Sequence, residues 1–421
     1  MIIVAIEILL LGIVGLFFLY LALLSILAFF RHNRKELSAS RLHRFAIVVP
    51  AHNEELTIEK TLKNLIAVNY PRKHFDVVVI ADNCTDRTAE VAREHGAIVY
   101  ERTNSNLRGK GHALRWCFDI LMSHQPSYDA FVVIDADSVA AANFLLVMNW
   151  YLENGSTVIQ ASDLVEPRPG VWSSEVIRLG FTLYNYVRPL GRSALRCSTG
   201  LRGNGMCFAR EIFEKFPWNT YSLNEDLEYS LQLLLNGFTV DFAPEAQVLA
   251  TMPSSARHAQ SQRMRWEKGR FPIIQKYSLP LLRNAITNLS LKSFDAFLDL
   301  VTPPLVNLFS FVSLMFTVTL FLWLFGIAGM GSFTILWALI IFLGLIHVFV
   351  GLRAAKADRS LYRSFLYIPR YAVWKLGVYM NIVRDVRSQE WIRTTRESST
   401  DIENVIATNK SINLHTPIKE G

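Results

Sequence analysis

Two aspartates, Asp135 and Asp137, follow the apolar run AFVVI at 130–134. Carboxylates this close repel each other unless a cation lies between them. Hard divalent cations bind oxygen ligands, and Mg²⁺ typically shares one or two carboxylates with the phosphates of a substrate. We therefore expect this pair to hold a metal ion, against the alternative of two solvated acids in a loop.

Polar residues also follow two other apolar runs. The run at 45–50 leads into AHNE at 51–54, and the run at 76–81 leads into Asp82. Each group alone has a structural explanation, because Asp and Asn favour turns and helix caps. Three such groups at the ends of three apolar runs together indicate a ligand site.

A positively charged loop precedes the helix-like run at 110–122. It reads RGKG at 108–111, with Lys110 between two glycines. Free backbone N–H groups and the dipole at a helix start favour anions, so this loop is suited to meet phosphate. It does not follow the P-loop pattern GxxxxGK[ST], which disfavours an ATPase.

The triplet Asn224-Glu225-Asp226 stands before the helix-like run at 227–235. Spacing alone leaves two interpretations open. The triplet is either an acidic cap with the first turn of a helix, or it offers a carboxylate that takes a proton from a hydroxyl group.

The segment QSQRMRWEKGR at 260–270 carries four cations around one tryptophan, shortly before the chain becomes apolar. One interpretation is a lipid-facing patch, in which Arg263, Lys268 and Arg270 face headgroups. The other is a clamp on a phosphorylated substrate.

Alternating strands and helices are expected to position these groups. Strands are predicted at 45–50, 76–81, 130–135 and 157–161, with an edge strand at 98–100; helices are predicted at 56–68, 89–94, 110–122 and 140–153. This alternation predicts an α/β domain with a mostly parallel sheet and helices on both faces. Ligands of such sheets bind at the carboxyl ends of the strands.

Long uncharged stretches predict membrane spans at about 8–30, 303–325 and 333–352. The first lacks a basic start and a cleavage-like site, which favours a retained anchor over a signal peptide. Basic residues follow the first and the last span, so residues 31–300 and the C-terminal tail are expected in the cytoplasm. The chain is thus predicted to be a multi-pass protein of the cell (inner or plasma) membrane.

Composition agrees with a membrane-attached protein. The 421 residues are 51% hydrophobic and 19% charged, and the net charge of +7 is largely explained by the basic flanks, so nucleic acid is not implied as a partner. The four cysteines form no CxxC pair, and free thiols are expected in a reducing cytoplasm.

The ordered motifs VPAHNEE, ADNCTD, RGKG, DAD, GNG, NED and QRMRW resemble those of the membrane-embedded family 2 glycosyltransferases. These are relatives of the cellulose, chitin, hyaluronan and poly-N-acetylglucosamine synthases. The resemblance covers about residues 45–270 and implies a GT-A-type domain. The expected organisation is a membrane helix at 1–30, a basic linker at 31–44, the GT-A domain at 45–275, an interfacial segment at 276–300, two membrane helices at 301–352, interfacial amphipathic helices at 353–395 and a flexible tail at 396–421.

The resemblance also implies roles for the residues that match its motifs. Nucleotide and donor binding is implied for Ala51, Asn53, Glu54, Asp82, Lys110, Asp135, Gln262 and Arg265. Mg²⁺ or Mn²⁺ would be bound by Asp137 and Asp135, with Asp137 the more direct ligand. The acceptor side would include Gly203, Asn204, Glu225 and Trp266, and Asp226 matches the catalytic base.

The implied reaction is an inverting displacement. The base deprotonates an acceptor hydroxyl, which attacks the anomeric carbon of a UDP-α-sugar and leaves a β-linkage. The metal and Arg265 would stabilise the departing diphosphate. Asn224 stands where the family usually has threonine, a departure that leaves the proposed base unchanged.

The product is left open. The QxxRW match at 262–266 favours synthesis of an extracellular or capsular polysaccharide. Three predicted spans are few for a polymer channel, which instead favours single transfer to a lipid-linked or other membrane-borne acceptor, or a channel completed by a partner protein. A catalytically idle nucleotide-binding scaffold is the third alternative, and the intact Asp135, Asp137, Asp226 and Arg265 argue against it.

Overall fold

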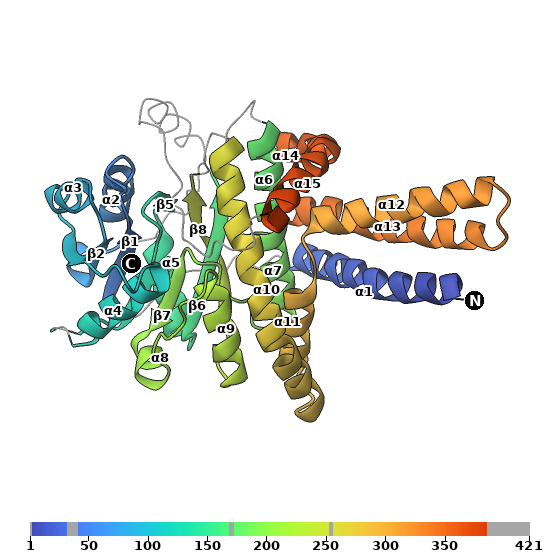
Figure 1. The fold of residues 1–421 in the computed structure, drawn as a ribbon. Helices are drawn as coiled ribbons and strands as arrows, with labels where there is room; N and C mark the ends of the chain where they lie inside the picture. Colours follow the sequence, from blue (N-terminus) through green and yellow to red (C-terminus); the bar gives the residue numbers. More distant parts are fainter. Residues whose placement is uncertain are drawn as a thin grey trace.

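The structure is a computed structural model that describes residues 2–31, 41–123, 125, 127–167, 172–251 and 256–384. Within these ranges the side chains at 2, 3, 256–266, 376 and 378–384 are not described. Figure 1 shows a domain built around a sheet, from which three long helices extend together to one side.

The sheet has eight strands within the described residues, in the order β3-β2-β1-β4-β7-β6-β8-β5. Their bounds are β1 Phe45–Ala51, β2 Phe75–Asp82, β3 Ile98–Arg102, β4 Ala130–Val133, β5 Ser138–Ala140, β6 Val158–Val165, β7 Met206–Ala209 and β8 Asp241–Ala250. The strands β3, β2, β1 and β4 run parallel, and so do β6 and β8. Strand β7 is antiparallel to both of its neighbours, and β5 is antiparallel to β8. The predicted α/β class is confirmed, with a mixed sheet.

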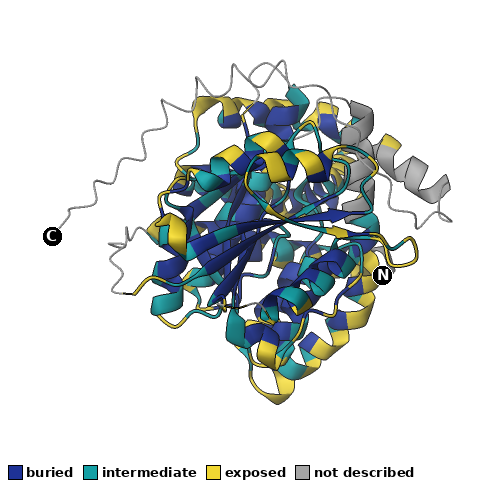
Figure 2. Cartoon of the chain, turned by 90° about the vertical axis from the view of Figure 1, so that its left-hand side faces the viewer, coloured by how far each residue is buried: buried dark blue, intermediate teal, exposed yellow. Residues whose placement is uncertain are grey.

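Helices cover both faces of the sheet, which explains the apolar runs in the strands. Ile47 and Val49 of β1 pack in one core with α2 (Ile58–Ile66) and α5 (Phe144–Glu153). The residues between them, including Val48, pack in a second core with α4 (Lys110–Met122), α8 (Arg210–Lys215) and α9 (Glu225–Leu235). Side chains alternate between the faces of a strand, so a strand covered on both sides is apolar throughout. Figure 2 shows the strands buried between the helices.

Three strands and one helix boundary differ from the sequence prediction. Strands β5 and β7 span three and four residues, too few to show a periodic pattern. Strand β8 is interrupted by Pro244 and by polar residues, which hide its strand character. The helix expected from residue 140 begins at Phe144, because residues 138–140 pair with β8.

Three helices among the described residues are long and apolar enough to cross a membrane: α1 (Ile2–Phe30), α12 (Leu305–Leu324) and α13 (Met330–Ala354). They correspond to the three predicted spans. Helix α13 packs against both α1 and α12. Ser25 Oγ of α1 lies 2.7 Å from His347 Nδ1 of α13, a buried polar contact of the kind that joins helices within a membrane.

Two further helices, α10 (Ala256–Thr287) and α11 (Leu291–Val301), lie between the sheet domain and the three long apolar helices. Buried polar contacts connect the layers. Arg192 of α7 (Arg188–Ala194) donates to Asp295 and Asp299 of α11 at 2.7 and 2.9 Å. Tyr20 of α1 donates to Asp295 at 2.8 Å. The sheet domain is therefore joined through α11 to α1.

The last described elements are α14 (Arg359–Ser364), a 3-10 turn at Phe365–Tyr367 and α15 (Ile368–Arg384). The region 353–395, where interfacial helices are expected, thus contains the end of α13 and two further α-helices within its described part. Pro369 lies in the first turn of α15, where the missing N–H costs no hydrogen bond. The interfacial position of these helices stays a prediction, and residues 385–421 lie outside the described part of the chain.

Candidate functional site

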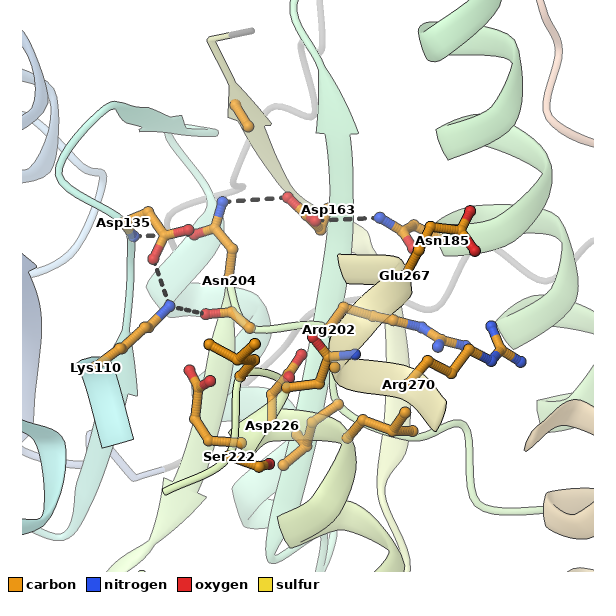
Figure 3. A pocket seen from close by; sticks show the side chains of 18 of the residues that line it. Lys110, Asp135, Asp163, Asn185, Arg202, Asn204, Ser222, Asp226, Glu267 and Arg270 are labelled. Atoms are coloured by element: carbon orange, nitrogen blue, oxygen red, sulfur yellow. Dashed lines mark hydrogen bonds and ion pairs between the residues drawn. The ribbon is translucent and has the colours of Figure 1, made fainter. Parts of the chain in front are cut away.

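A cavity of about 1410 Å³ opens at the carboxyl ends of β1, β2 and β4 and continues to α12 and α13. It therefore runs from the edge where such sheets bind ligands to two of the helices that are long and apolar enough to cross a membrane. Figure 3 shows its central part. The predicted site residues that line it are Ala51, Glu54, Asp82, Lys110, Asp135, Asp137, Gly203, Asn204, Glu225 and Asp226.

Lys110, the first residue of α4, connects two of the predicted motifs. Its ammonium group donates to Asp135 Oδ1 at 2.5 Å and to the Gly203 carbonyl oxygen at 2.6 Å. Figure 3 shows both contacts. Burial lowers the pKa of Lys110, but the surrounding carboxylates, Asp135 first, raise that pKa above its ordinary value. Lys110 therefore stays positively charged beside Asp135 and Asp137.

Asp226, the second residue of α9, lies against the loop at 203–205. Gly203 has a φ of +83°, and a Cβ atom there would come within 3.2 Å of Asp226 Oδ2. Burial raises the pKa of Asp226 above its ordinary value, although backbone hydrogen bonding and the charges of Lys110 and Arg202 oppose the shift. A half-buried carboxylate with a raised pKa suits a general base, because its proton affinity is closer to that needed near neutral pH.

Asn204 holds the same loop, residues 203–205, against the segment that carries Asp135 and Asp137. Its Oδ1 accepts from the Asp135 backbone N–H at 3.1 Å, and its Nδ2 donates to Ser138 Oγ at 3.0 Å and Asp163 Oδ1 at 3.1 Å. Burial, with the nearby charge of Asp135, raises the pKa of Asp163 well above its usual range. The side chain of Asn204 thus ties the 203–205 loop to the backbone of Asp135 and to the side chains of Ser138 and Asp163.

The predicted nucleotide end lies at β1 and β2. Asp82 lines the cavity and accepts a hydrogen bond from Arg102 Nη1 at 2.5 Å. Asn53 is not among the described residues that line the cavity. Its side chain instead joins the loops after the two strands, accepting from the Thr85 backbone N–H at 2.6 Å.

Helix α10 packs closely against the start of α9. A Cβ atom at Gly269 would come within 2.8 Å of Asn224 Oδ1 and 2.9 Å of Leu223 Cβ. The QxxRW match at 262–266 precedes this contact on the same helix. The side chains of Gln262, Arg265 and Trp266 lie outside the described part of the chain.

The lipid-facing interpretation is wrong for Arg270. Its guanidinium group donates to the backbone carbonyl oxygens of Asp299, Leu300 and Thr302 at 2.8, 2.8 and 3.1 Å. These carbonyls lie at the end of α11, where backbone acceptors lack partners within the helix. Lys268 lines the cavity, and the side chain of Arg263 is outside the described residues.

Three cavity residues, Tyr184, Arg188 and Arg202, were not predicted. Tyr184 lies in a π-helical segment, Thr182–Val187, between α6 (Trp172–Phe181) and α7. π-Helical turns are rare and often occur at functional sites. The available signal was compositional, because residues 188–202 contain four arginines.

The carboxylates of Asp135 and Asp137 suit a hard divalent cation whose remaining ligands are oxygens of the substrate. Among the described residues, no group of three or more His, Cys, Asp or Glu side chains could hold a metal. Asp135 and Asp137 nevertheless line the cavity together, and Asp135 already pairs with Lys110. Two carboxylates with phosphate oxygens from a ligand are the arrangement that Mg²⁺ commonly uses.

The chain is similar to several curated proteins. It is 24% identical over 389 residues to the probable glycosyltransferase YdaM of Bacillus subtilis, covering 87% of this chain and 89% of that one. It is 27% identical to the β-monoglucosyldiacylglycerol synthase of a Nostoc species, covering 65% and 58%. For the poly-β-1,6-N-acetyl-D-glucosamine synthase of Staphylococcus aureus the identity is 22%, covering 63% and 62%. The match thus spans less than two thirds of the last two relatives.

Among solved structures, the mannosyltransferase PcManGT of Pyrobaculum calidifontis, in complex with GDP-Man and Mn²⁺, aligns with a TM-score of 0.46 and 16% identity. The alignment covers 80% of this chain and 99% of that one. The sequence profile described as glycosyltransferase-like family 2 matches residues 43–269, more than half of the chain and the region that forms the sheet and most of the cavity lining. The protein therefore belongs to glycosyltransferase family 2.

Proposed function

We propose that this glycosyltransferase moves a sugar from a UDP-sugar to a membrane-borne acceptor hydroxyl, with inversion to a β-linkage. The observation that carries the proposal is one continuous cavity. It contains the Lys110–Asp135 pair, the half-buried Asp226 and a wall that includes residues of α12 and α13. A donor with a diphosphate and an acceptor from the membrane can therefore meet at Asp226.

The chain's own residues would bind the donor as follows. Asp82 would contact the uracil, and Lys110 would lie beside the diphosphate. Asp137 and Asp135 would hold Mg²⁺ or Mn²⁺, which supplies Lewis-acid stabilisation of the leaving diphosphate. Arg265 would add positive charge to the same leaving group.

Asp226 would act as the general base. Its carboxylate takes the proton of the acceptor hydroxyl, whose oxygen forms the new bond to the anomeric carbon. The bond from that carbon to the diphosphate oxygen breaks, and UDP leaves with the electron pair. General base catalysis contributes about 10²–10⁴-fold to such a step.

The extent of the cavity favours an acceptor held in the membrane. Its wall includes Leu305 and Val306 of α12 and His347 of α13. Relatives include both a glycolipid synthase and a polysaccharide synthase. Extension of an extracellular or capsular polysaccharide is the second candidate, supported by the QxxRW match, and would use a partner protein to complete a channel.

We further propose a multi-pass location in the cell (inner or plasma) membrane, with the sheet domain and the C-terminal tail on the cytoplasmic side. The support is the basic sequence after the first and the last apolar helix. Membrane lipids are then obligatory neighbours of the three apolar helices.

The test compares turnover with ligand binding in Asp226→Asn. We expect UDP release from the active UDP-sugar to fall by about 10²–10⁴-fold, because the base is lost, while UDP affinity changes less than twofold, on the order of the scatter of such measurements. Asp119→Asn removes an exposed carboxylate of α4 that pairs with Arg115 and serves as the control. Retained turnover in Asp226→Asn would remove the assignment of the base.

A further inference from the structure

Four arginines surround two aspartates on the side of the cavity away from Lys110: Arg188, Arg192, Arg202 and Arg270 around Asp295 and Asp299. Figure 3 shows Arg202 and Arg270 across the cavity from Lys110 and Asp135. Arg192 is paired with both aspartates at hydrogen-bond distance. Even if Asp226 is included, four positive charges face three negative ones.

Some nitrogens of the buried Arg188 and Arg202 side chains lack hydrogen-bond partners among the described residues, while Arg202 Nη2 donates to the Thr199 carbonyl oxygen at 3.4 Å. The side chain of Arg188 is 3% exposed, and its Nε and Nη1 make no hydrogen bond to the described residues. The side chain of Arg202 is 5% exposed, and its Nε likewise has no partner among the described residues. Their distances to Asp299 are 3.6 and 3.7 Å, too long for hydrogen bonds. Buried donors left unpaired are costly, so their retention calls for a ligand.

Tyr184 orients these two guanidinium groups. The Arg202 Cζ atom lies 4.3 Å and the Arg188 Cζ atom 4.9 Å from the centre of its ring. Burial raises the pKa of Tyr184, but the charges of Arg202 and Arg270 more than offset this, and the pKa lies below its ordinary value. Tyr184 of the π-helical segment thus contacts both cationic side chains where they line the cavity.

The same segment lies against the membrane helices. A Cβ atom at Gly351 of α13 would come within 3.0 Å of Leu183 and 3.2 Å of Val187. Helix α7 packs on α1, where Gly191 lies against the Leu24 carbonyl. The arginines therefore stand where the sheet domain meets helices that are long enough to cross a membrane.

We propose that Arg188 and Arg202 bind a phosphate group carried by a membrane lipid that serves as the acceptor or anchors it. The proposal rests on the proposed function, in which the acceptor is membrane-borne. Guanidinium groups match phosphate oxygens by paired hydrogen bonds, and the unpaired nitrogens of Arg188 and Arg202 are donors of this kind. The donor diphosphate has its own partners at the opposite side, beside Lys110.

The experiment measures lipid binding to the purified full chain in nanodiscs. The probes are phosphatidic acid and the diacylglycerol with the same acyl chains, each diluted in the same matrix lipid, and retention is followed by mass spectrometry of the released protein. We expect preferential retention of phosphatidic acid by at least about tenfold, the size of one charge-assisted hydrogen bond. Inorganic phosphate, added as a soluble source of the same chemistry, is expected to compete only weakly.

Two variants assign the preference to the cluster. Arg188→Gln and Arg202→Gln are each expected to abolish it, whereas Arg188→Lys keeps part of it. The control is Arg283→Gln, which removes the same charge from an exposed position on α10. The UDP affinity of each variant is measured to show that the variant is folded, and it should stay within about twofold of the wild-type affinity.

The proposal would be overturned by no preference for phosphatidic acid in a wild type that binds UDP, or by equal loss of the preference in Arg283→Gln. It would also be overturned by a loss of UDP affinity in Arg188→Gln that matches the loss of lipid, which would assign the cluster to the donor. Binding of inorganic phosphate alone would also reject a lipid ligand. Because none of these measurements requires sugar transfer, failure of the proposed function would appear separately, as absent UDP release from every UDP-sugar.

Discussion

The Lys110 ammonium lies 2.5 Å from Asp135 Oδ1 and bonds at the same time to the backbone of Gly203, the residue that Asp226 approaches. One side chain therefore connects the proposed metal ligands to the loop beside the proposed base. This arrangement gives Lys110 two effects, on binding of the donor and on the pKa of Asp226.

Replacing Lys110 by methionine is expected to weaken both UDP binding and turnover. The change removes charge-assisted bonds worth about 1.5–3 kcal/mol each, which corresponds to roughly 10–100-fold. Titration of UDP and steady-state turnover measure the two effects. Lys63→Met, which removes an exposed ion pair with Glu59, is the control and should change neither. Wild-type UDP affinity in Lys110→Met would contradict this role.

Turnover is expected to fall as pH decreases through the raised pKa of Asp226, because only the carboxylate can accept the proton. The acid limb should lie above the pH expected for an ordinary aspartate, about 3.9. Since Lys110 lowers the pKa of Asp226, Lys110→Met should move the limb to higher pH. The kcat profiles of both proteins test this, and a shift to lower pH in the variant would refute the coupling.

Gly203→Ala is expected to lower kcat more than it lowers stability. The backbone there has a φ of +83°, which disfavours any side chain, and the added Cβ would also crowd Asp226 Oδ2. Gly237→Ala provides a matched control, because Gly237 has a φ of +88° with nothing within 4 Å. Both variants should lose about 1 kcal/mol to backbone strain. If thermal unfolding and kcat respond alike in the two variants, crowding of the base is not important.

Arg192→Met is expected to destabilise the protein strongly, by about 3–5 kcal/mol, because it leaves Asp295 and Asp299 buried with poor partners. Thermal unfolding in detergent measures the loss. An exposed pair of the same chemistry, Arg93 with Glu101, contributes about 0–1 kcal/mol, so Arg93→Met should be nearly neutral. Equal effects would show that the contact between α7 and α11 contributes little.

Local patterns were sufficient to predict the parallel half of the fold and three candidate spans. Runs such as 45–50 are apolar because both faces of the sheet are covered. Uncharged apolar stretches of about twenty residues are typical of helices that cross a membrane. Strand β8 was missed because its pairing with β6 and β5, and not its composition, makes it a strand. Strands β5 and β7 were missed because they have too few residues to show the alternating pattern of a strand.

The site was predictable where function depends on residues next to strand ends, as for Asp82, Asp135 and Asp137. The contribution of Arg188 and Arg202 was not, because it depends on how the π-helical segment, α11 and α13 meet in space. The prediction for Arg270 was wrong for the same reason, since its partners are backbone carbonyls that lie beyond the end of its own helix, on α11.

The most direct measurement is UDP release and product analysis by the purified protein in lipid nanodiscs, with a panel of UDP-sugars and Mg²⁺ or Mn²⁺. We predict that one UDP-sugar is consumed only when metal is present, that Asp226→Asn stops the reaction, and that the product is a β-linked sugar on a membrane lipid or on a chain held at the membrane. Absence of UDP release with every donor, in protein that still binds UDP, would contradict this function and favour a nucleotide-binding scaffold.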